Sequence, residues 1–149
     1  MMKTNINFTK LRGLILAILL LAFTLGCGAT ETYDVPFSEG DVELVIVSNW
    51  WKEYKSVEDI EGIHKLYSQF DNIKILSNFD ERRDSISPGT YGYTYLFQLS
   101  DGTQYKYSAV NLDSSGARFN DATGTAYKVR NFNPIKIWNQ LDYEIQLLE

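Results

Sequence analysis

The sequence contains one cysteine and one histidine among its 149 residues. A structural zinc site takes about four cysteine or histidine ligands, and a disulfide takes two cysteines, so this chain has neither a multi-histidine zinc site nor a disulfide framework. It also lacks the glycine-rich phosphate loops of either common spacing. We therefore expect no cofactor and no metal, and the length indicates a single domain.

Positive charge is scarce in most of the chain. Residues 1–26 hold three of the 14 lysines and arginines and none of the 19 aspartates and glutamates, so the remaining 11 basic and 19 acidic residues give a net charge of −8. Such a charge opposes contact with phosphate backbones and anionic lipid head groups, which excludes nucleic acid as a favoured partner. The paired Arg82 and Arg83 lie among acidic residues and indicate a solvated loop.

The N-terminal residues follow the basic, apolar and small-residue order of a secretory signal peptide. Three basic residues, Lys3, Lys10 and Arg12, precede an unbroken apolar run from Leu14 to Phe23. The 13 residues from Gly13 to Leu25 are shorter than the roughly 20 that a membrane-spanning helix needs. Residues 1–26 are therefore predicted to be a signal peptide rather than a stable membrane span.

The chain's single cysteine follows a small residue at the end of this apolar run. The segment Thr24-Leu25-Gly26-Cys27 resembles the lipobox of bacterial lipoprotein precursors, although Thr24 stands where an aliphatic residue is usual. The resemblance, which covers only the first 27 residues, implies cleavage before Cys27, diacylation of its thiol and anchoring at the extracytoplasmic face of the cell membrane. The alternative is an ordinary secreted protein in which Cys27 has no such role.

Residues 27–40 are predicted to form the acylated cysteine and a flexible tether, because residues 28–40 are small or acidic and show no periodicity. Tyr33 and Phe37 argue against a fully flexible tether, since either ring could dock onto the domain. The folded domain is then expected to span residues 41–149.

The first half of this domain reads as strand, helix and strand. The β-branched run Val42–Val47 predicts a strand buried on both faces, while Trp50–Lys55 fits either a second strand or an irregular crossing. Ser56 offers a helix N-cap, and Gly62 within the helix suggests either a close packing partner or only modest intrinsic helicity. The predicted apolar stripe of the helix contains Val57, Ile60, Ile63, Tyr67 and Phe70. A strand over Ile73–Ser77 follows.

The second half begins, after a polar loop over 78–89, with strict alternation of aromatic residues from Tyr91 to Leu99. A turn at Ser100–Gly102 leads into a strand over Thr103–Val110. A two-residue loop would pair Phe97 with Lys106, whereas a three-residue loop closed by Gly102 in the left-handed conformation pairs Phe97 with Tyr105. The second register puts both aromatic rows on one side of the sheet and is the one we expect.

Further turns are expected at Asp113–Gly116 and Asp121–Gly124, with short strands over Ala117–Asn120 and Thr125–Arg130. Asn133 followed by Pro134 predicts a helix start, and the apolar residues of that helix are Ile137, Trp138, Leu141 and Ile145. The predicted fold class is α+β, a mostly antiparallel sheet with a meander of about four strands and two helices packed on one face.

Candidate catalytic residues are few. His64 lies beside the predicted apolar stripe, which favours a boundary residue over a general base. Oxygen-rich turns around Asp113 and Asp121, with Asn111, Ser115 and Asn120 nearby, lack the spacing of a calcium loop. Neither pattern points to a catalytic or metal site.

Trp50 and Trp51 are the candidate surface contacts. Adjacent residues in an extended segment point to opposite sides, so at least one indole is expected outside the core. The alternating residues Tyr93, Tyr95, Phe97 and Tyr105, in contrast, are expected to form the core face of the sheet. Tryptophan and tyrosine rings suit contacts with proteins, peptides or sugars.

These observations favour a small membrane-anchored envelope lipoprotein that acts as a non-enzymatic module and binds a protein, a peptide or a cell-wall component. Its lipid, on Cys27, would hold it to the membrane. The alternative is a small envelope hydrolase that uses surface carboxylates, with His64 or a tyrosine as helper.

Overall fold

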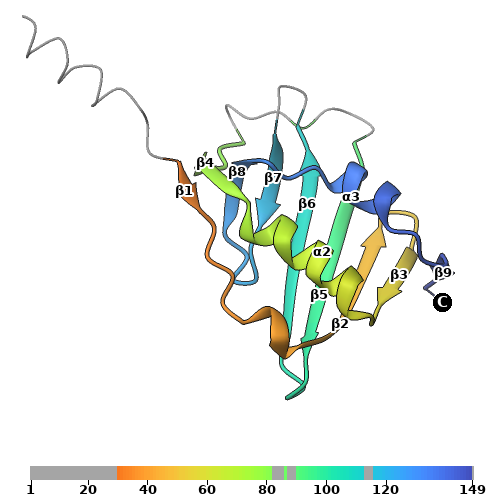
Figure 1. Ribbon diagram of the computed structural model, residues 1–149. Helices are drawn as coiled ribbons and strands as arrows, with labels where there is room; N and C mark the ends of the chain where they lie inside the picture. Colours follow the sequence, from red (N-terminus) through yellow and green to blue (C-terminus); the bar gives the residue numbers. More distant parts are fainter. Residues whose placement is uncertain (1–29, 82–85, 87–89, 113–115, 149) are drawn as a thin grey trace, which may run out of the picture. The chain divides into compact units, whose positions relative to one another are not determined.

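The structure, a computed structural model, describes residues 30–81, 86, 90–112 and 116–148 (Figure 1). Within this part, nine strands form one antiparallel sheet in the order β1-β4-β8-β7-β6-β5-β2-β3-β9, accompanied by two α-helices. The strands are β1 (Glu31–Thr32), β2 (Val42–Asn49), β3 (Glu53–Val57), β4 (Lys74–Asn78), β5 (Gly92–Leu99), β6 (Gln104–Asn111), β7 (Ala117–Asn120), β8 (Ala126–Arg130) and β9 (Gln146–Leu147). The helices are α2 (Ile60–Asp71) and α3 (Pro134–Gln140), and η1 (Glu39–Asp41) is a short 3-10 turn.

The predicted α+β class is therefore confirmed, with a sheet larger than the expected meander. In the described part, neither helix is long and apolar enough to cross a bilayer.

The β5–β6 hairpin forms the centre of the sheet in the predicted register. Phe97 pairs with Tyr105 and Tyr95 with Tyr107, so the aromatic rows of both strands share one side. Gly102 has a φ of +86°, and its N–H donates to the carbonyl of Leu99 at 2.9 Å. The three-residue loop closed by a left-handed glycine is confirmed.

Strand β2 lies between β5 and β3, as the apolar run Val42–Val47 predicts for a strand. Val45 and Val47 are fully buried, whereas Leu44 and Ile46 are only half-buried. The expectation of burial on both faces is wrong, because only one side of the strand lies against the core.

Helix α2 begins later than the sequence pattern predicts. Its N-cap is Asp59, whose carboxylate accepts a hydrogen bond from the N–H of Gly62 at 2.8 Å. Ser56, the predicted cap, lies instead in β3 and pairs with Ile46 of β2. Ile60 is consequently 84% exposed. The predicted stripe is wrong in its first turn because sheet pairing continues through Val57.

In the rest of α2, Ile63 and Phe70 of the predicted stripe are buried and Tyr67 is half-buried, while Leu66, which the stripe did not include, is buried as well. A Cβ atom on Gly62 would lie 2.5 Å from Cγ1 of Val57 and would also overlap the hydroxyl of Tyr143. The close packing partner predicted for Gly62 is confirmed.

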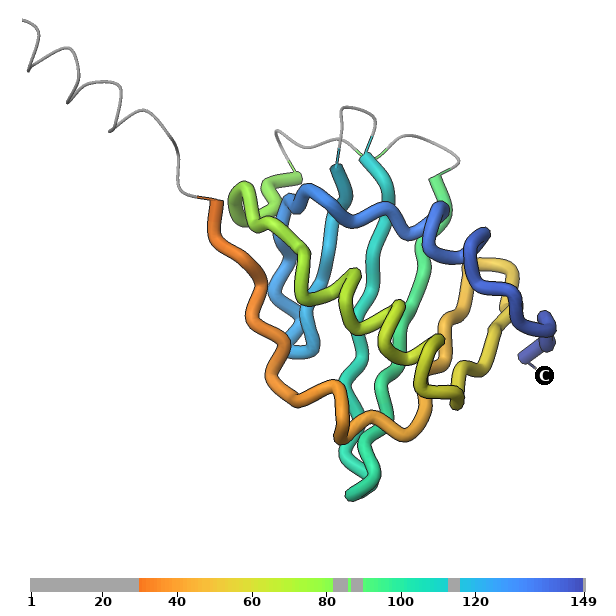
Figure 2. The backbone as a smooth tube through the Cα atoms, in the orientation of Figure 1, coloured from red at the N-terminus to blue at the C-terminus, as the bar shows by residue number. Residues whose placement is uncertain are grey.

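Residues 31–40 do not form a flexible tether. Tyr33, Val35 and Phe37 are buried in the main core, and the Tyr33 N–H donates to the carbonyl of Ile73 at 2.9 Å. In Figure 2 this segment, in orange, runs from the β4 edge to the start of β2. The domain therefore begins at Glu31 rather than Asp41, because three alternating apolar side chains stabilise a segment that otherwise has the composition of a linker.

Helix α3 begins at Pro134 with Asn133 as its N-cap, as predicted, but it ends at Gln140. Leu141 is buried just beyond the helix, whereas Ile145 is exposed. The predicted continuation of the apolar stripe to Ile145 is wrong, because the chain turns there to pair β9 with β3.

Lys55 of β3 is buried against the end of α3. Its ammonium donates to the carbonyls of Trp138 and Leu141, at 3.1 and 2.5 Å, and lies 4.7 Å from the centroid of the Trp138 ring. Burial lowers the pKa of Lys55. The lysine thus binds two carbonyls at the helix end, of which that of Trp138 also accepts from the Leu141 N–H at 3.3 Å.

The centre of the core contains aromatic rings on alternate residues of β5 and β6. Phe70 of α2 packs edge-on against Tyr95 and Phe97, at centroid distances of 5.2 and 4.9 Å. Trp138 of α3 lies 5.9 Å from Tyr93. The buried hydroxyl of Tyr95 has no hydrogen-bond partner within the described residues.

Candidate functional site

The turn between β2 and β3 presents the two adjacent tryptophans. The side-chain carbonyl of Asn49 accepts hydrogen bonds from the N–H groups of Trp51 and Glu53, at 3.0 and 3.1 Å, and its amide donates to the Glu53 carboxylate at 2.7 Å. Lys52 adopts a φ of +62°. A buried asparagine therefore fixes the backbone that carries both indoles.

Both indoles lie outside the core. Trp50 is 75% exposed and Trp51 is 52% exposed. The Trp51 ring packs against Tyr91 at an interplanar angle of 40°, with 4.0 Å between ring centroids. The expectation that at least one indole is outside the core is confirmed, and we call Trp50, Trp51 and Tyr91 the aromatic tip.

Exposed apolar side chains continue from the tip along the C-terminal segment. Leu147, on edge strand β9, and Leu148 are both exposed. The N–H of Leu148 donates to the carbonyl of Lys52 at 2.8 Å, which places it directly beside the tip. Clustered exposed apolar side chains are typical of a contact surface.

A cleft of about 560 Å³ lies between α2, α3 and the ends of β6 and β8. Sheet register places it at the same end of the sheet as the aromatic tip, because Asn49 ends β2 where β5 begins and β6 ends. Its described lining residues are Gln69, Asn111, Leu112, Gly116, Arg130, Asn131, Phe132, Asn133, Lys136, Ile137 and Gln140. Nothing in the sequence pattern grouped these residues.

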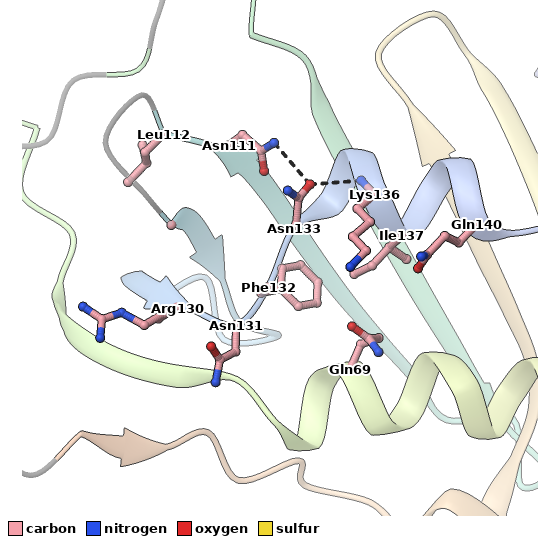
Figure 3. Close-up of a pocket in the computed structure, with 11 residues that line it drawn as sticks. Gln69, Asn111, Leu112, Arg130, Asn131, Phe132, Asn133, Lys136, Ile137 and Gln140 are labelled. Atoms are coloured by element: carbon pink, nitrogen blue, oxygen red, sulfur yellow. Dashed lines mark hydrogen bonds between the residues drawn. The ribbon is translucent and has the colours of Figure 1, made fainter.

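The described lining of this cleft contains five amide side chains and two cations and no carboxylate. The Asn133 carbonyl accepts from the Lys136 N–H at 3.0 Å and from the Asn111 amide at 3.3 Å (Figure 3). Asn131 has a φ of +62°, which asparagine tolerates better than most residues. Polar groups thus surround a floor that includes the buried Phe132.

A smaller cleft, of about 230 Å³, lies where the C-terminal segment meets the start of α2. The Tyr143 hydroxyl donates to the Asp59 carboxylate at 2.5 Å. This bond, with that from the Gly62 N–H, lowers the pKa of Asp59, while burial and the neighbouring carboxylate raise the pKa of Tyr143 to about 12. A phenol held protonated in this way is a poor general base, and the pair joins two segments of the chain.

His64 lies on the outer side of α2 with 65% of its side chain exposed. Its Nδ1 is 2.9 Å from a carboxylate oxygen of Glu39, so the pair links the helix to η1. His64 lines neither of the two clefts described above.

The structure describes only some of the other residues that the sequence analysis singled out. Cys27, the Arg82–Arg83 pair and residues 113–115 lie outside the described residues. The Asp121 carboxylate accepts from the N–H groups of Thr123 and Thr125, both at 2.9 Å, and so closes the predicted turn that ends at Gly124. No group of three or more potential metal ligands occurs in the described part of the chain.

Comparison with protein-family models, with curated protein sequences and with solved structures finds no match for this chain.

Proposed function

We propose that this protein is a lipid-anchored envelope module that binds a protein, a peptide or a cell-wall component through the aromatic tip, without catalysing a reaction. The observation that carries the proposal is the exposure of Trp50 and Trp51 on a turn held by Asn49. Rigid aromatic side chains lose little conformational freedom on binding, which makes such a turn suited to contact.

The packing of the helices supports a contact surface at this end of the sheet. Tyr93, Tyr95 and Phe97 alternate on β5, and the first contacts α3 while the other two contact α2. We infer that both helices cover the same face of the sheet. The central aromatic face is then closed to partners, and the tip is where aromatic rings remain accessible.

The arrangement of titratable groups favours binding over hydrolysis. His64 is exposed and lines none of the described clefts, and the carboxylate of Asp59 is engaged by Tyr143. A general acid and base pair requires groups that converge on a substrate with matched pKa values. The described clefts do not bring His64 and a carboxylate together around a shared space.

The binding proposal is tested by chemical crosslinking in intact cell envelopes with the full-length chain. We expect the double substitution Trp50→Ser, Trp51→Ser to abolish the crosslinked species that the unaltered chain forms. Ile60→Ser is the matched control, because Ile60 is also an exposed apolar residue, at the start of α2. Crosslinking that survives the double substitution, or that Ile60→Ser also removes, would contradict the proposal.

The anchor is tested separately through Cys27. We expect Cys27→Ala to abolish labelling by a radioactive fatty acid and to release the protein from the membrane fraction or leave its signal uncut. Each buried methylene of an acyl chain contributes about 0.8 kcal/mol, and stable attachment takes more than one chain. A Cys27→Ala chain that remains processed and membrane-bound would show that the lipid anchor is wrong.

A further inference from the structure

We propose that the cleft between α2, α3 and the ends of β6 and β8 binds a carboxylate that is flanked by hydroxyl or amide groups. The inference goes beyond the proposed function, since it concerns residues separate from the aromatic tip. Its basis is a contrast in charge. Acidic residues outnumber basic ones by 19 to 14 in the chain, yet the described lining of this cleft holds Arg130 and Lys136 and no carboxylate.

The two cations lie at different parts of the cleft. In Figure 3 the Lys136 side chain turns toward Gln69, and Gln140 lies on the same side, whereas Arg130 projects at the opposite end. No acidic partner for either cation is found within the described residues, and both side chains are exposed. Their hydrogen-bonding capacity is therefore available to an anionic ligand, which a guanidinium and an ammonium bind through charge-assisted hydrogen bonds.

The amides supply the second part of the recognition. The side chains of Gln69, Asn131 and Gln140 line the cleft and make no hydrogen bond to another described residue. Each amide both donates and accepts, so the three match a ligand rich in hydroxyl or amide groups. Phe132 and Ile137 provide the apolar surface against which the body of such a ligand would lie.

Two sources share this chemistry, an acidic sugar and the free C-terminus of a peptide. We would titrate the full-length chain, labelled with ¹⁵N in zwitterionic detergent, with glucuronic acid and with N-acetyl-alanyl-alanine, and follow the amide resonances by NMR. Glucose and the C-terminally amidated dipeptide are the neutral counterparts. The expected result is a saturable shift of cleft resonances with at least one acid and a much weaker response to its neutral counterpart.

The response of variants decides whether the cleft is the site. We expect Arg130→Gln or Lys136→Gln to weaken binding of the acid by about tenfold, the loss typical of one charge-assisted hydrogen bond. Lys106→Gln, at an exposed lysine of β6 that does not line the cleft, is the matched control and leaves affinity unchanged. Thermal melting of each variant shows whether it folds.

The Trp50→Ser, Trp51→Ser chain separates this proposal from the previous one, since it should bind the acid normally. A response to glucuronic acid alone assigns the cleft to acidic sugars, and a response to the dipeptide alone assigns it to peptide termini. The proposal would be overturned if neither acid shifted the cleft resonances or if the neutral counterparts bound equally well. It would also be overturned if Lys106→Gln lowered the affinity for the acid as much as Arg130→Gln or Lys136→Gln.

Discussion

Two groups of aromatic side chains in this protein have opposite surroundings. The rings of Tyr95, Phe97 and Tyr107 alternate along paired strands and are almost completely buried. Trp50 and Trp51 are adjacent in a turn and are exposed. Ring chemistry is similar in both groups, so backbone position decides the outcome: alternation directs every ring to one face, whereas a turn leaves its rings outside the sheet.

The largest effect should come from removing a buried ring. Phe97→Ala leaves a cavity beside Phe70 and should lower the free energy of unfolding by about 3–5 kcal/mol. Urea unfolding followed by circular dichroism measures this change. A loss below about 1 kcal/mol would show that the aromatic face is not the packed core.

A smaller loss should follow from disturbing the turn that sets the register of these rings. Gly102→Val places a β-branched residue at a φ of +86° and should cost more than about 1 kcal/mol of unfolding free energy. Gly40→Val is the control, because a Cβ at either glycine meets open space and only Gly102 has a positive φ. Equal losses in the same urea experiment would argue against strain at the turn.

Within the buried group, the hydroxyl of Tyr95 should lower the stability of the folded state. Tyr95→Phe removes a buried hydroxyl that lacks a partner in the described residues. We therefore expect the free energy of unfolding, measured by heat or urea, to rise by about 1 kcal/mol. Tyr67→Phe should instead lower the free energy of unfolding by about the same amount, because the Tyr67 hydroxyl donates to the Phe37 carbonyl at 2.9 Å. A loss of stability in Tyr95→Phe would mean that this hydroxyl is satisfied.

The smallest effect is expected at the tip. Trp50→Ser should change the free energy of unfolding by less than about 0.5 kcal/mol, as is usual for exposed positions. Trp51→Ser should lower the free energy of unfolding somewhat more, because the Trp51 ring packs against Tyr91. If Trp50→Ser were as destabilising as Phe97→Ala, the contrast between the two groups would not hold.

Local patterns in the sequence predicted those parts of the fold that local geometry determines. The alternation from Tyr93 to Leu99, the glycine turn and the Asn133-Pro134 helix start agree with the structure, whereas Tyr91 precedes β5 and is exposed. The start of α2 was not predictable in this way. Ser56 is a good cap by type, but pairing with Ile46 across the β2–β3 turn places it in a strand, and the cap motif does not reveal that pairing.

The candidate sites show the same limit. Two adjacent tryptophans were recognisable because a single extended segment cannot bury both. The cleft was not, because Gln69 of α2 meets Asn111 of β6 and Lys136 of α3 only after folding. The polar stretch from Arg130 to Asn133 was the one local signal, and without the contribution of α2 it indicates an ordinary loop.

The buried lysine of β3 also bears on how the chain completes its fold during synthesis. Lys55 lies in the first half of the sequence, but the carbonyls of Trp138 and Leu141 that hold its ammonium are made near the end. The outer edge of β3 likewise pairs with β9, which is made later in synthesis. A nascent chain still missing these residues has an open sheet edge and a Lys55 ammonium exposed to water, so this side of the sheet closes only after α3 and β9 have been made.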